Sequence, residues 1–218
     1  MSIEPTHIDL KLAEYIRAHA SGRDETLRLV ENETAAMGSI QIMQTAPEQA
    51  AFLEMLVRLG RGRRAIEVGT FTGYGAIRIA RGLAEEGRLL CCELDPERAE
   101  IARRNVDRAG VGDKVEISVG PAIETILGLP DEPVFDFAYV DADKTGYPDY
   151  YEALMPRMNP GGLITFDNVF MGGRILDSEP DQGTAAMQRL NDLLVDDERV
   201  DSVMLGMADG LTLARVRD

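Results

Sequence analysis

A glycine-rich segment, residues 66–75, constrains the fold more than any other part of the chain, and it reads I-E-V-G-T-F-T-G-Y-G. The apolar run that leads into it is typical of a buried parallel strand, and residues 76–80 after it favour a helix. This order of strand, glycine-rich turn and helix brings the backbone of an α/β sheet close to a nucleotide-like ligand. The glycine spacing is G-x-x-x-G-x-G and no Lys-Ser/Thr pair follows, so neither a dinucleotide fingerprint nor a phosphate-cradling P-loop is predicted.

The next predicted strand, residues 88–92, ends at an acidic residue, Glu93. A carboxylate at the tip of the second strand can accept hydrogen bonds from both hydroxyls of a ribose. A ligand that contains adenosine but no phosphate fits both features. Together, E-V-G-T-F-T-G-Y-G and C-E-L-D-P-E resemble the class I S-adenosylmethionine-dependent methyltransferases. They resemble most closely the cation-dependent catechol and caffeoyl-CoA O-methyltransferase family.

Predicted strands and helices alternate through the middle of the chain, which is typical of a parallel, doubly wound α/β sheet. The carboxyl ends of such strands lie along one edge, where ligands bind. Residues 200–207 and 211–216 favour two strands joined by a hairpin through Asp209-Gly210. The resemblance implies a Rossmann-like sheet of seven strands, mostly parallel with an antiparallel C-terminal hairpin, and helices on both faces. The expected helices are residues 96–109, 121–127, 150–158 and 184–194, and the expected strands are residues 114–119, 134–140 and 163–166.

The N-terminal part is expected to be helical, and residues 1–218 are expected to form one domain with residues 1–40 as a helical cap. Two helices are predicted between residues 8 and 37, with a break at residues 21–24. They form either a layer packed on the sheet or, as the resemblance implies, part of the roof of the active site. A third helix is expected to start at Pro47, with a buried face made of Phe52, Met55, Leu56 and Leu59.

Acidic and amide side chains follow two of the predicted strands. Asp141 ends the strand at 134–140, and Asp167 and Asn168 end the strand at 163–166. Because the tips of neighbouring parallel strands lie side by side, these three side chains can converge. Two carboxylates and an amide oxygen form an all-oxygen site that suits Mg²⁺, with Mn²⁺ or Ca²⁺ as less favoured alternatives. The alternative is that these residues are ordinary turn residues at strand ends.

The resemblance becomes specific at this acidic edge, where V-D-A-D-K-x-x-Y and then F-D-N match the metal and catalytic motifs of the family. The match implies that Asp141, Asp167 and Asn168 bind the metal, that Lys144 is the general base beside Asp141, and that Asp143 lies beside the cofactor. The residues that the resemblance places around S-adenosylmethionine are Met43, Glu67, Gly69, Thr70, Phe71, Gly73, Gly75, Glu93, Leu94, Ala122, Asp141 and Asp143.

Two residues depart from the family pattern. Gly75 stands where the family usually has Ser, so a hydroxyl contact to the cofactor is lost. Met171 stands where many members have Trp, in a position that would help to wall the acceptor pocket. Specificity for catechols therefore does not follow from the resemblance alone.

Composition narrows the classes of partner. The net charge of −15 argues against non-specific binding to nucleic acid or to an anionic membrane, since both need a positive surface. The only two cysteines, Cys91 and Cys92, are adjacent in a predicted strand and are interpreted as reduced core residues pointing to opposite faces, so a cytoplasmic location is expected. With two histidines in the whole chain, a His-based zinc site or a Ser-His-Asp triad is not predicted.

The predicted reaction is transfer of a methyl group from S-adenosylmethionine to a hydroxyl of a small molecule, by an enzyme that the resemblance implies is a homodimer. The acceptor is either a catechol-like aromatic compound or an aliphatic hydroxyl on a polyketide or carrier-bound acyl group. A nicotinamide-dependent oxidoreductase is a rival, but it predicts the pyrophosphate-type glycine spacing that this chain lacks. A non-catalytic cofactor-binding module is a second rival, and it predicts a broken acidic edge.

Overall fold

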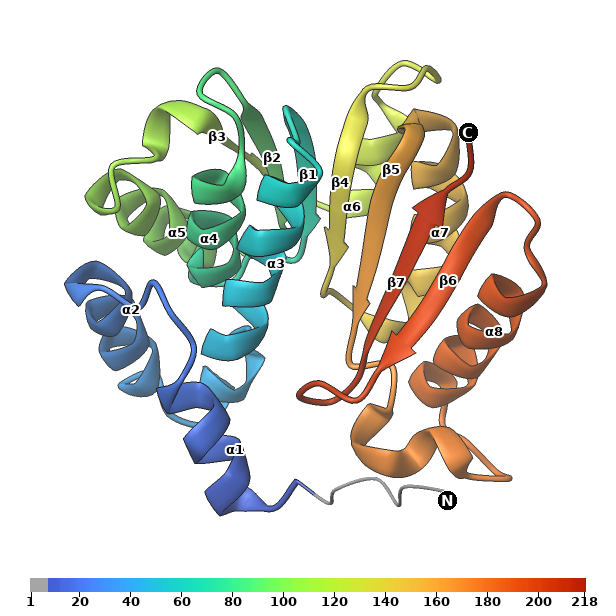
Figure 1. Ribbon diagram of the computed structural model, residues 1–218, viewed down its shortest axis with the longest axis horizontal. Helices are drawn as coiled ribbons and strands as arrows, with labels where there is room; N and C mark the ends of the chain where they lie inside the picture. Colours follow the sequence, from blue (N-terminus) through green and yellow to red (C-terminus); the bar gives the residue numbers. More distant parts are fainter. Residues whose placement is uncertain (1–7) are drawn as a thin grey trace.

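The computed structural model describes residues 8–218, and a seven-stranded sheet in the order β3-β2-β1-β4-β5-β7-β6 runs through it (Figure 1). Strands β1 to β5 pair in parallel, and β7 is antiparallel to both β5 and β6. The predicted mixed sheet and C-terminal hairpin are therefore confirmed. The beginning of the expected N-terminal cap, residues 1–7, lies outside the described residues. The strands are Arg64–Val68 (β1), Arg88–Glu93 (β2), Val115–Val119 (β3), Phe135–Val140 (β4), Met158–Asp167 (β5), Val200–Leu205 (β6) and Leu211–Val216 (β7).

Helices cover both faces of the sheet, as predicted. Figure 1 shows α3, α4 and α5 on one side and α6, α7 and α8 on the other, and each set packs on its own buried apolar cluster. The helices are Leu10–Ala18 (α1), Glu25–Ala35 (α2), Pro47–Leu59 (α3), Tyr74–Gly82 (α4), Pro96–Arg108 (α5), Ala122–Leu127 (α6), Tyr147–Leu154 (α7) and Gln182–Asp196 (α8). Short 3-10 helices are Gly38–Met43 (η1), Gly112–Lys114 (η2), Lys144–Gly146 (η3), Met155–Arg157 (η4) and Met171–Leu176 (η5).

The strands alternate between the two apolar clusters because successive side chains point to opposite faces of a sheet. In β4, Phe137 and Tyr139 join the cluster under α3 and α4, whereas Ala138 and Val140 join the cluster under α7. The adjacent Cys91 and Cys92 divide in the same way and are both free and buried, as predicted. Each layer of helices is thus held by its own set of strand side chains.

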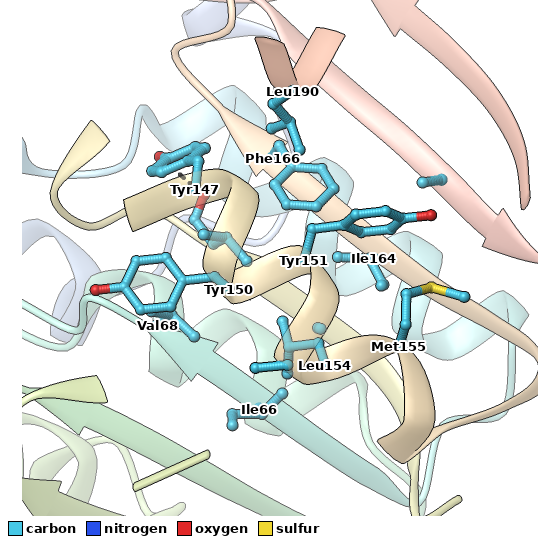
Figure 2. Packing of buried hydrophobic residues seen from close by; sticks show 14 of the residues in the cluster. Ile66, Val68, Tyr147, Tyr150, Tyr151, Leu154, Met155, Ile164, Phe166 and Leu190 are labelled. Carbon is cyan, nitrogen blue, oxygen red and sulfur yellow. Dashed lines mark hydrogen bonds between the residues drawn. The ribbon is translucent and has the colours of Figure 1, made fainter. Parts of the chain in front are cut away.

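Aromatic side chains of α7 dominate the cluster on the second face. Figure 2 shows Tyr147 and Tyr151 of α7 on either side of Phe166 of β5, with Leu190 of α8 nearby, whereas Tyr150 points away from Phe166 toward Val68. The ring centroids of Tyr147 and Tyr151 lie 6.1 and 6.0 Å from that of Phe166, within the usual range for aromatic pairs. This packing fixes the start of α7 next to the carboxyl end of β4, where the candidate site lies.

The predicted buried face of the third helix is only partly correct: Phe52 and Leu56 are partly buried and pack against the apolar cluster, but they are not its most buried residues. The start at Pro47 after the cap residue Ala46 is as expected, but Met55 and Leu59 are 55% and 75% exposed. The buried side chains are instead Gln49, Ala50, Leu53 and Val57. The reason is close helix packing: α4 meets α3 at Gly82, where a side chain would collide with the backbone of α3, so a face of smaller residues turns inward.

Strand β5 begins earlier than predicted, and the helix before it ends earlier. The expected helix ran to residue 158 and the expected strand began at residue 163, but β5 already starts at Met158 and contains residues 159–162. Asn159 donates a hydrogen bond from Nδ2 to Asp136 Oδ1 at 2.8 Å, and the pairing with β4 shifts register between Phe135 and Phe137. The irregular pairing and the hydrogen bond of Asn159 thus allow β5 to continue through residues 159–162, although their sequence is typical of a turn.

The two N-terminal helices differ in how they pack. No residue of α1 is buried, whereas Leu27 and Val30 of α2 are fully buried in the cluster that includes α4. The hydroxyl of Thr34 in α2 also donates to Thr72 Oγ1 at 3.0 Å, next to the glycine-rich turn. Helix α2 is therefore part of the core, packed outside α4 rather than directly on the sheet. None of the helices in residues 8–218 has the length and apolar character needed to span a bilayer.

We expect substitution of Gly69 to be much more destabilising than substitution of another glycine with the same backbone geometry. Gly69 follows β1 with φ +94°, and a Cβ there would collide with the backbone oxygen of Asp141. Gly110 has φ +69° with open space around it. Gly110→Ala should cost about 1–2 kcal/mol for the left-handed backbone alone. Gly69→Ala should cost about 1–3 kcal/mol more because the strand tips must separate.

Urea unfolding of the two variants measures this difference directly. Equal losses of stability in Gly69→Ala and Gly110→Ala would show that the tips of β1 and β4 are not in tight contact.

Candidate active site

A cavity of about 890 Å³ opens at the carboxyl ends of β1, β2, β4 and β5. Its walls come from the loops that follow these strands, from η1 and the start of α3, and from the turn between β6 and β7. This is the edge at which ligands bind in parallel α/β sheets. Of the residues predicted from sequence, those that line the cavity are Met43, Gly69, Phe71, Glu93, Leu94, Ala122, Asp141, Asp143, Lys144, Asp167 and Asn168.

Glu93 is held rigidly at the tip of β2. Its Oε2 accepts a hydrogen bond from the backbone N–H of Phe71 at 2.7 Å, and its Oε1 accepts one from the N–H of Asp95 at 3.0 Å. Phe71 makes this bond with φ +51°, an uncommon backbone conformation for a bulky residue. The glycine-rich turn and the end of β2 are thus tied together, and each carboxylate oxygen keeps a lone pair for a ligand.

Glu67, Thr70, Gly73 and Gly75 lie behind the cavity wall rather than on it. Gly73 starts α4 with φ +85° and packs against Ala102 of α5, where it allows close packing between the two helices. These four residues shape the turn, and the cavity surface itself is formed by their neighbours.

Gly75 provides space for the carboxyl group of Glu67. A Cβ at Gly75 would collide with Glu67 Oε1, and Glu67 is buried beneath the turn with Cys91 Sγ 3.4 Å from its Oε2. Burial, with a smaller contribution from the charges of Asp141 and Glu93, raises the pKa of Glu67 to about 8. Position 75 thus has no side-chain hydroxyl, and the carboxyl group of Glu67 occupies the space that a side chain at this position would take.

Asp141 and Asp167 converge at the tips of β4 and β5, as predicted from the strand order. The hydroxyl of Tyr139 donates to Asp167 Oδ2 at 2.7 Å and lies 3.4 Å from Asp141 Oδ2, so the two carboxylates are neighbours. Asp167 Oδ1 accepts from the backbone N–H of Asn168, whose φ of +56° is well tolerated by Asn. Burial and the charge of Asp141 raise the pKa of Asp167 to about 6.

Lys144 lies at the cavity wall in contact with this acidic pair. Its Nζ donates to Asp141 Oδ1 at 2.9 Å and to the hydroxyl of Tyr147 at 2.6 Å. Tyr147 in turn donates to the backbone oxygen of Val140 at 3.1 Å, at the end of β4. The ammonium group is thus fixed on the side of Asp141 that faces away from Tyr139.

Asp143 caps η3 and holds Tyr150 at the cavity. Its carboxylate accepts from the backbone N–H of Gly146 at 3.1 Å and from the hydroxyl of Tyr150. Both Asp143 and Tyr150 line the cavity, so this carboxylate borders the space between the glycine-rich turn and the acidic edge.

The donor set at the acidic edge suits a hard divalent cation. It has two neighbouring carboxylates and the carboxamide of Asn168, all on the cavity wall. Within residues 8–218, no group of three or more His, Cys, Asp or Glu side chains has an arrangement that could hold a metal. A cation at this edge would therefore depend on the amide oxygen as its third protein ligand, with water or acceptor oxygens in the other positions.

The residues of this region that sequence analysis missed include Gln49, Arg98, Tyr139 and Tyr150. Gln49, Arg98 and Tyr150 line the cavity, and Arg98 lies over the ring of Phe71 with its Cζ 5.5 Å from the centroid. Tyr139 is fully buried behind the two aspartates. Signals existed for two of them. Tyr139 is a polar tip two residues before Asp141 and must lie on the same face of β4. Gln49 ends a Met-x-x-x-x-x-Gln stretch like that of the resembled family, of which only Met43 was assigned.

The expectation that Met171 walls the acceptor pocket is wrong. Met171 has φ +53°, is 7% exposed and packs in the cluster under α7 and α8. Of the described residues in this region, Asn168, Ala208 and Asp209 line the cavity instead.

Comparisons with known proteins agree with this geometry. A family model described as O-methyltransferase matches residues 17–217. A probable caffeoyl-CoA O-methyltransferase 1 from Dictyostelium discoideum is 36% identical over 177 residues, 79% of this chain and 77% of that protein. A catechol O-methyltransferase from Niastella koreensis is 34% identical over 211 residues, 93% of this chain and 95% of that protein.

A solved structure has the same fold with a related sequence. The O-methyltransferase from Bacillus cereus, in complex with SAH, aligns with a TM-score of 0.87 and 32% identity over 95% of this chain and 97% of that one. The matched residues include the glycine-rich turn, the acidic edge and the C-terminal hairpin. This chain therefore belongs to the O-methyltransferase family, and it is an enzyme of that family.

Proposed function

We propose that this enzyme transfers a methyl group from S-adenosylmethionine to a hydroxyl of a small molecule, with a divalent cation, Mg²⁺, bound by Asp141, Asp167 and Asn168. The observation that carries the proposal is that one cavity has the Glu93 turn at one wall and the acidic edge at another. A donor held by the turn would therefore face an acceptor held at the edge.

Three features support S-adenosylmethionine as the methyl donor. Glu93 presents a fixed carboxylate at the tip of β2, where a ribose would be bound. Gln44 lines the cavity, and its buried Oε1 has no hydrogen-bond partner among residues 8–218. The related structure from Bacillus cereus holds SAH.

In the proposed reaction, the residues of this chain align the reactants and move one proton. A bound divalent cation would hold the acceptor hydroxyl and lower its pKa. Lys144 accepts the hydroxyl proton at Nζ in its neutral amine form, which the charge of a cation bound beside Asp141 would favour; Asp141 and Tyr147 hold Nζ at the cavity wall. The bond between the methyl carbon and the sulfonium sulfur then breaks as the methyl group passes directly to the acceptor oxygen, and S-adenosylhomocysteine leaves, so the remaining task of the protein is alignment.

We propose a catechol-like aromatic compound as the acceptor, because two adjacent oxygens can occupy two positions around one cation. Relatives named for caffeoyl-CoA and catechol support this choice. The alternative acceptor is an aliphatic hydroxyl on a polyketide or carrier-bound acyl group. A methylation screen over vicinal diols and their mono-hydroxy analogues separates the two classes.

A homodimer in the cytoplasm is the proposed assembly and location. Exposed apolar side chains on α3, Met55 and Leu59, are consistent with a contact between copies. The two cysteines are free, which is consistent with a reducing compartment. Light scattering measures the assembly.

Cofactor binding should depend on Glu93. Glu93→Ala removes charge-assisted hydrogen bonds that contribute about 1.5–3 kcal/mol each, so calorimetry should show at least about tenfold weaker binding of S-adenosylmethionine. Glu100→Ala, which removes an exposed carboxylate from α5, the helix that follows β2, is the matched control and should leave the affinity unchanged. Unaltered affinity in a folded Glu93→Ala protein would remove Glu93 from the cofactor site.

Chelation should stop methyl transfer but leave the binding of S-adenosylmethionine largely intact, because the acidic edge and the glycine-rich turn are separate parts of the cavity. Added Mg²⁺ should restore the rate. Asp167→Asn keeps the size of the side chain but removes its charge, so this variant should be as inactive as the wild type in excess chelator, and added Mg²⁺ should not restore its rate. Asn168→Ala should have a milder effect because the amide is neutral.

The assay is turnover with added EDTA and then Mg²⁺, with any acceptor that the screen identifies. Asp192→Ala, an exposed aspartate on α8, is the control and should respond to EDTA like the wild type. Full activity in excess chelator after exhaustive dialysis would rule out the metal-dependent mechanism, and Asp141 and Asp167 would then be turn residues at strand ends.

A further inference from the structure

We propose that Tyr139 is a positioning residue of the cation site: its buried hydroxyl fixes the carboxylate of Asp167 in the orientation that binds the metal. The inference rests on the metal-dependent function proposed above. Tyr139 does not line the cavity, and it is not one of the three proposed metal ligands.

The position of Tyr139 follows from the pleat of β4. It lies two residues before Asp141 and therefore points to the same face of the sheet. Neighbouring β5 carries Asp167 one residue beyond Phe166, which pairs with Val140. The phenol hydroxyl consequently reaches between the two carboxylates, at 2.7 Å from Asp167 Oδ2 and 3.4 Å from Asp141 Oδ2.

Other buried groups determine the direction of this hydroxyl. Gln49 Nε2 donates to the Tyr139 oxygen at 3.3 Å, and Thr45 Oγ1 lies 3.3 Å from it. Tyr139 and Gln49 are 0% and 1% exposed, so water does not compete for these contacts. Because the oxygen of Tyr139 accepts from Gln49, its single hydrogen is available for Asp167, to which the shorter bond is made.

The carboxylate of Asp167 is thereby held at both oxygens. Oδ1 accepts from the backbone N–H of Asn168 at 2.7 Å, and Oδ2 accepts from Tyr139 at 2.7 Å. One hydrogen bond to each oxygen fixes the plane of the carboxylate and leaves further lone pairs for a cation. Hydrogen bonds that orient a metal-ligating side chain in this way typically change metal affinity by about 10- to 100-fold when they are removed.

The network also joins the cation site to the start of α3. Thr45 precedes this helix and Gln49 lies in its first turn, and both residues line the cavity. The side chain of Tyr139 therefore makes hydrogen bonds both to these two residues and to the acidic pair.

The test compares the wild type, Tyr139→Phe and Tyr151→Phe as full-length proteins. Each is titrated with Mn²⁺, and electron paramagnetic resonance measures the concentration of the free ion. Tyr151 is the matched control, since its buried ring carries a hydroxyl that donates to Asp197 Oδ2 at the same distance of 2.7 Å, away from the cavity. Tyr139→Phe should raise the dissociation constant for Mn²⁺ by about tenfold or more. Tyr151→Phe should leave it within about twofold.

Two further measurements make the result specific. Calorimetry should show that Tyr139→Phe binds S-adenosylmethionine as the wild type does, and thermal unfolding should show similar losses of stability in both variants. Equal or tighter Mn²⁺ binding by Tyr139→Phe would overturn the inference while the metal-dependent function stands. Failure of the wild type to bind Mn²⁺ or Mg²⁺ at all would overturn both.

Discussion

The register of the parallel strands is the constraint on which the site depends. Val68 of β1 pairs with Cys92 of β2 and with Val140 of β4, and Val140 pairs with Phe166 of β5. These four strands therefore end within one residue of the same level, and the residue that follows each of these pairs falls on one edge. A shift of one residue in any pair would turn its terminal side chain to the other face of the sheet. Four separate sequence segments meet in one cavity only because this register holds.

The sequence was sufficient to predict residues whose position follows from their place at the end of a strand. Glu93, Asp141 and Asp167 are of this kind, and their meeting follows from parallel pairing alone. The face of α3 was not predictable, because it depends on how closely α4 approaches at Gly82, a distance that helical periodicity does not contain. The network around Tyr139 was hidden for a different reason: its partners come from α3 and β5, and local patterns do not show which hydroxyl reaches which carboxylate.

Uncommon backbone conformations concentrate around the cavity. Phe71, Asn168 and Ala208 all have positive φ without being glycine, and each belongs to a different loop of the cavity wall. Such conformations cost free energy and persist only where surrounding contacts hold them. The contacts are visible for two of them, since the N–H of Phe71 donates to Glu93 and the N–H of Asn168 donates to Asp167. The carboxylates that we propose for the cofactor and metal thus also hold the loops of the cavity in place.

The space shared by Gly75 and Glu67 has a consequence for how this chain can diverge. A side chain at position 75 would occupy the volume of Glu67 Oε1, so the effect of a substitution there depends on the side chain at position 67. The two positions are coupled in the sense of epistasis: a serine introduced alone displaces the buried carboxyl group, whereas with a shorter residue at 67 it enters free volume. The effects of single substitutions at positions 67 and 75 are therefore not expected to add.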